Sequence, residues 1–174
     1  MSKKDTYLIT GGCGFIGSAV IRHLLKNNNN IVINIDKLSY ASNVDAVEAS
    51  EGESYIFIKD DIINKEKINE ILMNYSPDYI IHLAAESHVD RSIDNPLSFI
   101  ESNILGTFNL LDKCYSYWKN LEKKSKDKFK FLFVSTDEVY GSTTDESFSE
   151  LSPLRPNSPY AASKASADLL ARSW

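Results

Sequence analysis

The sequence predicts an α/β fold in which a doubly wound parallel sheet is flanked by helices. Three observations predict it: short apolar runs alternate with amphipathic helical patterns, a glycine-rich turn follows the first run, and an acidic residue ends the second. The 174 residues suit one domain with a single core. We expect parallel strands in the order 3-2-1-4-5, joined by right-handed crossovers.

Composition and charge exclude several classes of protein. Hydrophobic residues make up 43% of the chain and charged residues 25%, as in ordinary globular proteins. The formal net charge of -5 argues against a surface for nucleic acid or anionic membranes. Because no targeting segment or bilayer-length apolar run is found, we expect a cytoplasmic protein without nucleic-acid or membrane partners. Cys13 and Cys114 are expected to be free thiols, and no Cys/His spacing indicates a metal site.

A glycine-rich turn follows the first predicted strand, 6–10. Its three glycines have the spacing GxxGxxG and precede a helical pattern. Glycine permits positive φ and lets backbone N–H groups approach a pyrophosphate at a helix N-terminus. A tight turn without a ligand is the alternative interpretation. The residues of this turn expected to contact the cofactor are Gly11, Gly14, Phe15, Ile16 and Gly17.

The second predicted strand, 31–35, ends in Asp36. This carboxylate lies about 20 positions beyond the glycine turn, the spacing at which an acidic residue holds the adenosine ribose of NAD. Its charge would repel the 2′-phosphate of NADP, so we expect NAD as the cofactor of a Rossmann-type domain. Lys37 could in principle meet a phosphate, which weakens that preference slightly. The minority interpretation of Asp36 is a turn residue without a ligand.

The third and fourth predicted strands, 55–58 and 79–83, end at the same edge of the sheet, and a helix is predicted over 65–75. His82 alternates within its strand and is more readily explained as a core residue than as a catalyst. His88, in a polar loop, is expected to line the substrate pocket together with Ser87. The expected cofactor contacts here are Asp61, Ile62, Leu83, Ala84 and Ala85.

The fifth predicted strand, 129–134, is expected to be buried and is followed by a hydroxyl and two carboxylates, at Thr136, Asp137 and Glu138. In open α/β sheets, ligands bind outside the carboxyl ends of the strands, so these groups would face a substrate. A polar loop with a turn at Gly141 is the alternative. A long helix is predicted from Pro96 to about 118, and a final helix from about Tyr160.

Five motifs cover nearly the whole chain: TGGCGFIG (10–17), DKLSYA (36–41), LAAESHVDRS (83–92), STDEVYG (135–141) and SPYAASKASAD (158–168). In this order they resemble the extended short-chain dehydrogenase/reductase superfamily and, within it, the dTDP-glucose 4,6-dehydratase family. The resemblance implies an NAD-dependent dehydration of a nucleotide-activated glucose to the 4-keto-6-deoxy sugar. It adds Lys37, Ser39, Tyr160 and Lys164 to the expected cofactor contacts.

The resemblance also implies catalytic roles. Tyr160 would remove the proton of the hexose 4-hydroxyl while hydride passes from C4 to NAD, with Lys164 stabilising the phenolate and binding the nicotinamide ribose. Thr136 would hydrogen-bond the same hydroxyl. Glu138 would take the C5 proton and protonated Asp137 would protonate the departing 6-hydroxyl, before hydride returns to C6. Thr136, Asp137 and Glu138 are thus expected to contact the substrate as well.

Two alternatives stay open. A nucleotide-sugar 4-epimerase needs the Tyr, Lys and Thr but no adjacent acid and base, and a non-catalytic NAD-binding module needs none of them. Members of the family that the sequence resembles are much longer. We therefore expect residues 1–174 to be the NAD-binding domain, without the C-terminal portion that binds the nucleotide sugar. We expect this domain to bind NAD without turnover. A homodimer through helices around 95–118 and 160–174 is implied by the resemblance alone.

Overall fold

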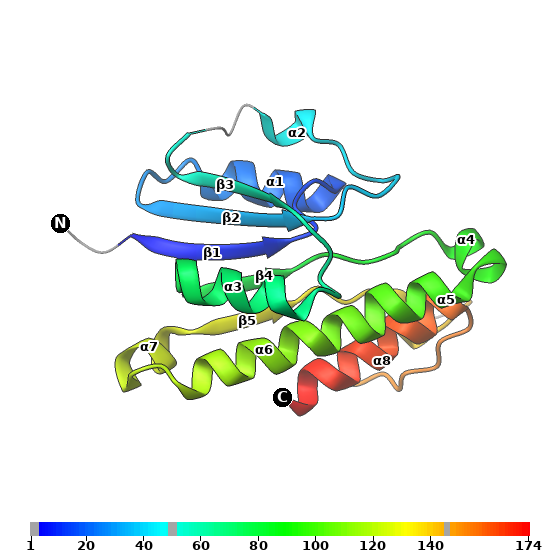
Figure 1. Ribbon diagram of the computed structural model, residues 1–174. Helices are drawn as coiled ribbons and strands as arrows, with labels where there is room; N and C mark the ends of the chain where they lie inside the picture. Colours follow the sequence, from blue (N-terminus) through cyan, green and yellow to red (C-terminus); the bar gives the residue numbers. More distant parts are fainter. Residues whose placement is uncertain (1–3, 49–51, 145–146) are drawn as a thin grey trace.

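A five-stranded parallel sheet in the order β3-β2-β1-β4-β5 forms the centre of the protein, with helices on both faces (Figure 1). The computed structural model describes residues 4–48, 52–144 and 147–174. The predicted Rossmann-type fold and strand order are confirmed. Each strand begins and ends within one residue of its predicted bounds: β1 (Asp5–Thr10), β2 (Asn30–Asp36), β3 (Tyr55–Lys59), β4 (Tyr79–His82) and β5 (Lys130–Phe133).

The helices follow the strands as the sequence pattern predicts, with short additional ones in the loops. Helix α3 has its predicted bounds, and α8 begins one residue before Tyr160. The helices are α1 (Phe15–Leu24), α2 (Asp45–Glu48), α3 (Lys65–Tyr75), α4 (Val89–Asp94), α5 (Pro96–Phe99), α6 (Thr107–Lys119), α7 (Lys123–Lys128) and α8 (Pro159–Ser173). No helix in the described part of the chain has both the length and the apolar character needed to span a membrane.

The sheet carries a separate hydrophobic cluster on each face. Neighbouring residues of a strand point to opposite sides, so Leu8 packs with residues of α3 and α6 while Ile9 packs with Ile21 of α1 and Val47 of α2. Both clusters exclude water from the strands, which is the main stabilising contribution to such a fold. The rigid sheet therefore fixes where the strand ends, and the loops that follow them, lie.

The predicted long helix is interrupted. Instead of one α-helix, the chain forms α5, a π-helix over Ile100–Gly106, and then α6. At Gly106 an added Cβ would lie 2.7 Å from Cδ1 of Ile62, so the helix packs closely against the loop after β3 and a larger residue would displace the Ile62 side chain. A π-turn shifts the side chains that follow around the helix axis, a change that sequence periodicity does not reveal.

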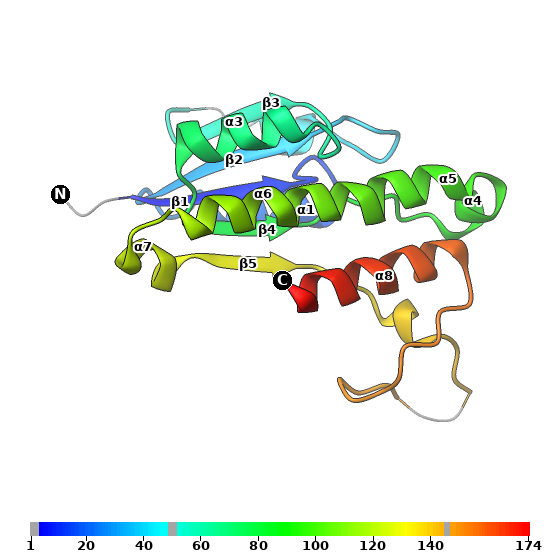
Figure 2. The ribbon, with the colours of Figure 1, turned by 60° about the horizontal axis from the view of Figure 1, so that its bottom comes forward.

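Strand β5 differs from its prediction in burial. It was expected to be a buried strand, but Leu132 is 55% exposed because β5 pairs only with β4 in the described part of the chain and so forms an edge. The described parts of the segment between β5 and α8, residues 134–144 and 147–158, project away from the sheet (Figure 2). Helix α8 returns from it, capped by Ser158, whose Oγ accepts a hydrogen bond of 3.0 Å from the N–H of Ala161.

Candidate functional site

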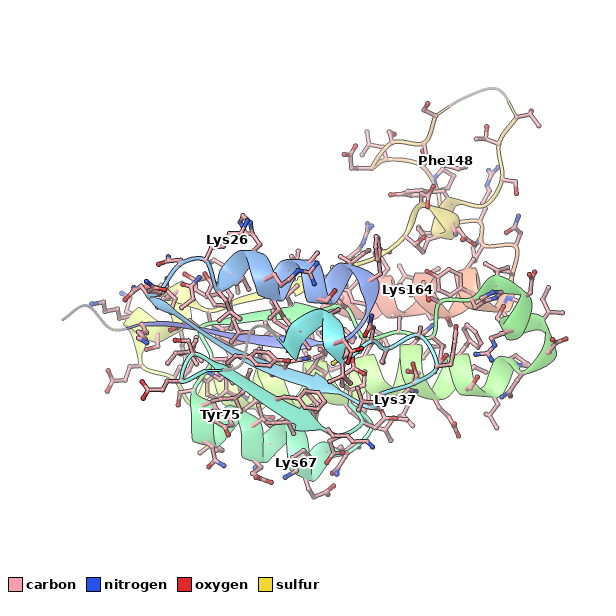
Figure 3. All side chains as sticks on the ribbon, turned by 90° about the horizontal axis from the view of Figure 1, so that it is seen from above. Lys26, Lys37, Lys67, Tyr75, Phe148 and Lys164 are labelled. Atoms are coloured by element: carbon pink, nitrogen blue, oxygen red, sulfur yellow. The ribbon has the colours of Figure 1, made fainter. Side chains whose placement is uncertain are left out.

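A cavity of about 330 Å³ opens where the strands end. Figure 3 shows Lys37 and Lys164 toward this end of the sheet, away from Tyr75 at the far end of α3. The structure brings every residue predicted to contact the cofactor to its walls: Gly11, Gly14, Phe15, Ile16, Gly17, Asp36, Lys37, Ser39, Asp61, Ile62, Leu83, Ala84, Ala85, Tyr160 and Lys164. Residues distant in sequence thus form one concave site of the size that holds small ligands.

The glycine turn forms a wall that only glycine can build. Gly11 has a φ of 72°, and a Cβ on it would lie 2.6 Å from the backbone nitrogen of Ala84. Helix α1 begins after Gly14 without a side-chain cap and without an acidic residue in its first turn. Its first N–H groups therefore remain available to an anion, which the positive end of the helix dipole also favours.

Asp36 connects the glycine turn to the loop after β2. Its Oδ2 accepts a hydrogen bond of 2.9 Å from the N–H of Cys13. Its Oδ1 accepts from the N–H of Leu38 at 2.8 Å and from the hydroxyl of Ser42 at 2.9 Å. A carboxylate has about four acceptor positions, so one position on Oδ2 remains for a ligand hydroxyl. Asp36 is therefore a structural anchor as well as a candidate ligand contact.

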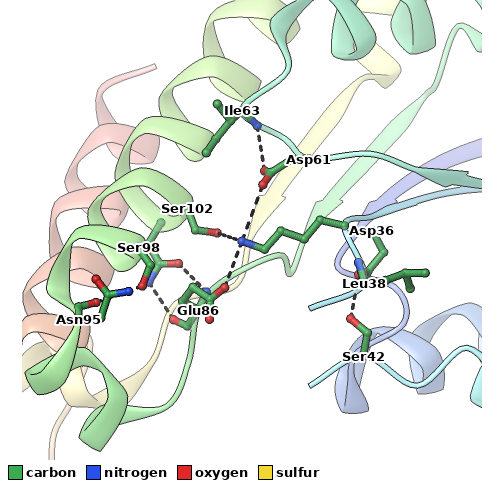
Figure 4. Close-up of polar contacts among 11 residues, drawn as sticks. Asp36, Leu38, Ser42, Asp61, Ile63, Glu86, Asn95, Ser98 and Ser102 are labelled. Carbon is green, nitrogen blue, oxygen red and sulfur yellow. Dashed lines mark hydrogen bonds and ion pairs between the residues drawn. The ribbon is translucent and has the colours of Figure 1, made fainter. Parts of the chain in front are cut away.

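The positive charge of Lys37 is already paired. Its Nζ lies 3.1 Å from a carboxylate oxygen of Glu86, 3.8 Å from Asp61 and 3.5 Å from the hydroxyl of Ser102. Figure 4 shows Asp61, Glu86 and Ser102 converging on one point from three different segments. With two carboxylates beside it, Lys37 presents little net positive charge to an anion in the cavity.

Helix α8 contributes two buried polar side chains, Tyr160 at 8% exposure and Lys164 at 5%. Burial raises the pKa of Tyr160, and the nearby carboxyl groups of Glu138 and Asp137 raise it further, whereas a hydrogen bond with Thr136 lowers it. Burial lowers the pKa of Lys164 to about 8, against the opposing effect of Asp168. Tyr160 is therefore protonated at neutral pH, and Lys164 can change its charge near the physiological range.

The segment expected to carry the acid and base folds into a 3₁₀ helix, Asp137–Tyr140. Thr136 caps it: its hydroxyl accepts a hydrogen bond of 3.3 Å from the N–H of Glu138 and donates one of 3.3 Å to Oδ1 of Asp137. The two carboxyl groups thus belong to one short turn next to the phenol of Tyr160, whose pKa both influence.

Some predicted substrate residues do not line the cavity. Ser87 does, but Thr136, Asp137 and Glu138 lie beyond its walls, and His88 is exposed at the N-cap of α4. Sequence reasoning left out several residues that do line it. Of these, Ser102 depends on the π-turn and left no signal in the sequence, whereas Ser135 begins the motif STDEVYG and Ser42 directly follows the motif DKLSYA. The omitted residues are Ile35, Ala41, Ser42, Asp60, Ser102, Val134 and Ser135.

Metal ligation has no candidate within residues 4–48, 52–144 and 147–174, since no group of three His, Cys, Asp or Glu side chains is suitably placed there. Both cysteines are buried free thiols. The polar chemistry of the site therefore rests on the hydroxyl, carboxyl and amino groups described above.

The sequence model of the GDP-mannose 4,6 dehydratase family matches residues 8–174. The chain belongs to this family. It is 48% identical over 170 residues to a dTDP-glucose 4,6-dehydratase of Neisseria meningitidis serogroup B, covering 96% of this chain and 48% of that protein.

Solved structures of a dTDP-glucose 4,6-dehydratase and of a UDP-glucose 4-epimerase have the same fold as this chain. A dTDP-glucose 4,6-dehydratase from Streptomyces venezuelae, crystallised with NAD bound, has a TM-score of 0.86 and 41% identity over 97% of this chain and 51% of its own. A UDP-glucose 4-epimerase of Thermus thermophilus in complex with NAD has a TM-score of 0.81 and 31% identity over 97% of this chain and 50% of its own. The chain thus spans about half the length of the relatives it matches.

Proposed function

We propose that the protein containing this chain catalyses NAD-dependent dehydration of a nucleotide-activated glucose, dTDP-glucose, to the 4-keto-6-deoxy sugar nucleotide. Residues 1–174 would form its NAD-binding domain and supply the catalytic groups. The observation that carries the proposal is the pair of adjacent carboxyl groups, Asp137 and Glu138, which both raise the pKa of Tyr160, a residue that lines the cavity. The dTDP-glucose dehydratases among the relatives support it.

The cavity fits NAD. The uncapped start of α1 supplies N–H groups suited to a pyrophosphate, and Asp36 retains one acceptor position for a ribose hydroxyl. Lys37 is neutralised by Glu86 and Asp61, so a 2′-phosphate would meet the Asp36 carboxylate without a free cation to compensate it. NAD would supply a hydride acceptor that later returns the hydride to the sugar.

Tyr160 is the proposed base for the sugar 4-hydroxyl. Its raised pKa in the free protein means that it needs an additional positive charge before it can lose its proton at neutral pH. Lys164, one helical turn further along α8 on the same cavity wall, is the proposed source, together with its contact to the nicotinamide ribose. Thr136 lowers the pKa of Tyr160 and would share the sugar hydroxyl.

Asp137 and Glu138 are the proposed acid and base of the elimination. Glu138 would take the C5 proton and Asp137 would donate a proton to the departing 6-hydroxyl. A 4-epimerase, the second candidate, moves no proton at C5 and has no use for this pair. Although a 4-epimerase also has the same fold, at a TM-score of 0.81, the adjacent carboxyls favour dehydration.

We further propose a homodimer and a cytoplasmic location. Helices α5, α6 and α8, and the π-helix between α5 and α6, present large apolar side chains to solvent in the described structure. Such a patch fits a second copy of the chain packed helix against helix. Sedimentation velocity should then give the mass of a dimer. The exposed apolar residues are Leu97, Ile100, Leu105, Tyr115, Trp118 and Leu169.

The experiment that tests the proposed function has two parts. Calorimetric titration of this chain with NAD should show saturable binding, and incubation with NAD and dTDP-glucose should give no 4-keto-6-deoxy product, because the relatives are about twice as long. The full-length protein should form that product, detected by its absorbance in alkali. Formation of a 4-epimer instead would favour the second candidate, and absence of NAD binding would overturn the proposal.

A further inference from the structure

One buried histidine is not used by the proposed chemistry. His82, the last residue of β4, is 1% exposed and lies between two threonine hydroxyls. Its Nδ1 is 2.6 Å from Oγ1 of Thr10, at the end of β1. Its Nε2 is 2.9 Å from Oγ1 of Thr107, the first residue of α6. Both ring nitrogens are therefore hydrogen-bonded, and a purely apolar residue would leave both hydroxyls without this partner.

The direction of each hydrogen bond follows from counting protons. The hydroxyl of Thr107 lies 2.6 Å from the carbonyl oxygen of Asn103. A carbonyl oxygen only accepts, so Thr107 must donate its one proton there. Toward His82, Thr107 can then only accept, and Nε2 must carry the hydrogen.

The other side of the ring is fixed by the same reasoning. Burial, together with the charge of Lys164, lowers the pKa of His82 to about 3 and keeps the ring neutral. A neutral ring with hydrogen on Nε2 has none on Nδ1, so Nδ1 accepts from the hydroxyl of Thr10. Thr10 in turn accepts from the N–H of Ala84 at 3.2 Å. All donors run in one direction, from Ala84 through the ring to Asn103.

This chain of hydrogen bonds joins two walls of the site. At one end, Ala84 lines the cavity and touches Gly11 of the glycine turn closely enough to forbid a Cβ there. At the other end, Asn103 binds the main chain of Glu86, accepting at 2.8 Å and donating at 2.9 Å. Asn103 also donates at 2.9 Å to Ser163 on the helix that carries Tyr160 and Lys164.

We propose that His82 is a positioning residue. As the Nε2–H tautomer, it holds the loop after β4 and the π-helix in fixed positions relative to each other. The cavity wall formed by that loop is thereby aligned with α8. His82 itself does not line the cavity. The binding of NAD to this wall rests on the proposed function. The tautomer of His82 and the position of Ala84 do not depend on the proposed function.

The first test observes the ring directly, by ¹⁵N NMR of the histidine-labelled protein. We expect His82 to show a hydrogen on Nε2 and none on Nδ1 throughout the range from about pH 8 to about pH 5. A hydrogen on Nδ1, or titration of His82 within that range, would overturn the proposal.

The second test separates hydrogen bonding from packing. Thr107→Val removes the acceptor for Nε2–H at nearly constant volume, and Thr107→Ser keeps the hydroxyl. We expect Thr107→Val to speed amide exchange of Ala84 and to weaken NAD binding, each by about tenfold, and Thr107→Ser to change either by about twofold at most. Equal behaviour of the two variants, or an unchanged Ala84 in a folded Thr107→Val, would count against the proposal.

A second pair of variants guards against loss of folding. If circular dichroism shows Thr107→Val unfolded, the pair Thr10→Val and Thr10→Ser interrupts the same chain from the other side, with the same expected difference in exchange at Ala84. If the unaltered protein does not bind NAD at all, the proposed function fails, but the ¹⁵N shifts and the exchange at Ala84 still decide the role of His82.

Discussion

Lys164 donates a hydrogen bond of 2.7 Å from Nζ to the main-chain oxygen of Val134, where β5 ends. Its ammonium group also lies 4.3 Å from the centre of the Phe133 ring. These contacts replace only part of the hydration that the charge loses, so the pKa falls to about 8. The same side chain lines the cavity, so its charge would act on a ligand bound there.

We expect the affinity for NAD to fall as the pH rises above about 8, because the free protein then loses the Lys164 charge that would contact the ligand. Titrations of NAD at a series of pH values on both sides of that point measure it. Lys164→Met should bind more weakly and show no such dependence, whereas Lys67→Met, which removes a surface ammonium on α3, should retain it. A pH-dependent loss that persists in Lys164→Met would refute the assignment.

His82 should make the protein sensitive to mild acid. Its pKa is about 3 in the folded protein against an ordinary value of 6.5, so the unfolded chain binds more protons between those values and stability falls as the pH decreases. The free energy of unfolding should decrease by about 1.4 kcal/mol per pH unit below roughly pH 6.5, before most carboxylates titrate.

Urea unfolding at closely spaced pH values checks this slope. His23→Gln and His88→Gln remove exposed imidazoles and should leave it unchanged. A flat profile down to about pH 5 would mean that His82 is accessible to protons in the folded state.

Local sequence patterns predict much of the fold and most of the cavity-lining residues expected to contact the cofactor. The alternation of apolar runs and helical patterns predicted all five strands and their order. Asp36 could be located because the length of the helix and strand that follow the glycine turn fixes its distance from that turn along the chain. The features that the sequence did not predict depend on tertiary contacts. Ser102 reaches the cavity only through the π-turn, and β5 was expected to be buried because an apolar run does not reveal whether a strand has one neighbour or two.

His88 stays a prediction as a substrate contact, although the structure places it outside the cavity walls. Its polar surroundings in the sequence predicted a pocket residue, yet the loop turns into α4 at this point and leaves the imidazole exposed. Polarity distinguishes a loop from a strand, but the direction of a loop side chain is set by the next helix, which the sequence pattern did not predict here.

Asp36→Asn should reduce both stability and NAD affinity. The amide keeps one acceptor oxygen where the carboxylate uses two, so a backbone N–H of Cys13 or Leu38 loses its partner, at a cost of about 1–3 kcal/mol. We expect NAD to bind at least about tenfold more weakly, and the preference for NAD over NADP to narrow. Asp45→Asn, at an exposed carboxylate of α2, is the matched control and should change neither. Unchanged NAD affinity in Asp36→Asn would contradict the role proposed for this carboxylate.

Asp137 and Glu138 provide the sharpest test of the proposed reaction, because they separate elimination from redox chemistry. In the full-length protein, Asp137→Asn and Glu138→Gln remove a proton donor and a proton acceptor but leave Tyr160 and Lys164 in place. Each should lower product formation by about 100-fold or more while dTDP-glucose still reduces bound NAD, seen as absorbance of the reduced nicotinamide in a single turnover. Glu150→Gln, an exposed control beyond the 3₁₀ helix, should match the unaltered enzyme. If either variant instead lost NAD reduction and retained elimination, the order of roles would be wrong, since elimination requires the 4-keto group that oxidation creates.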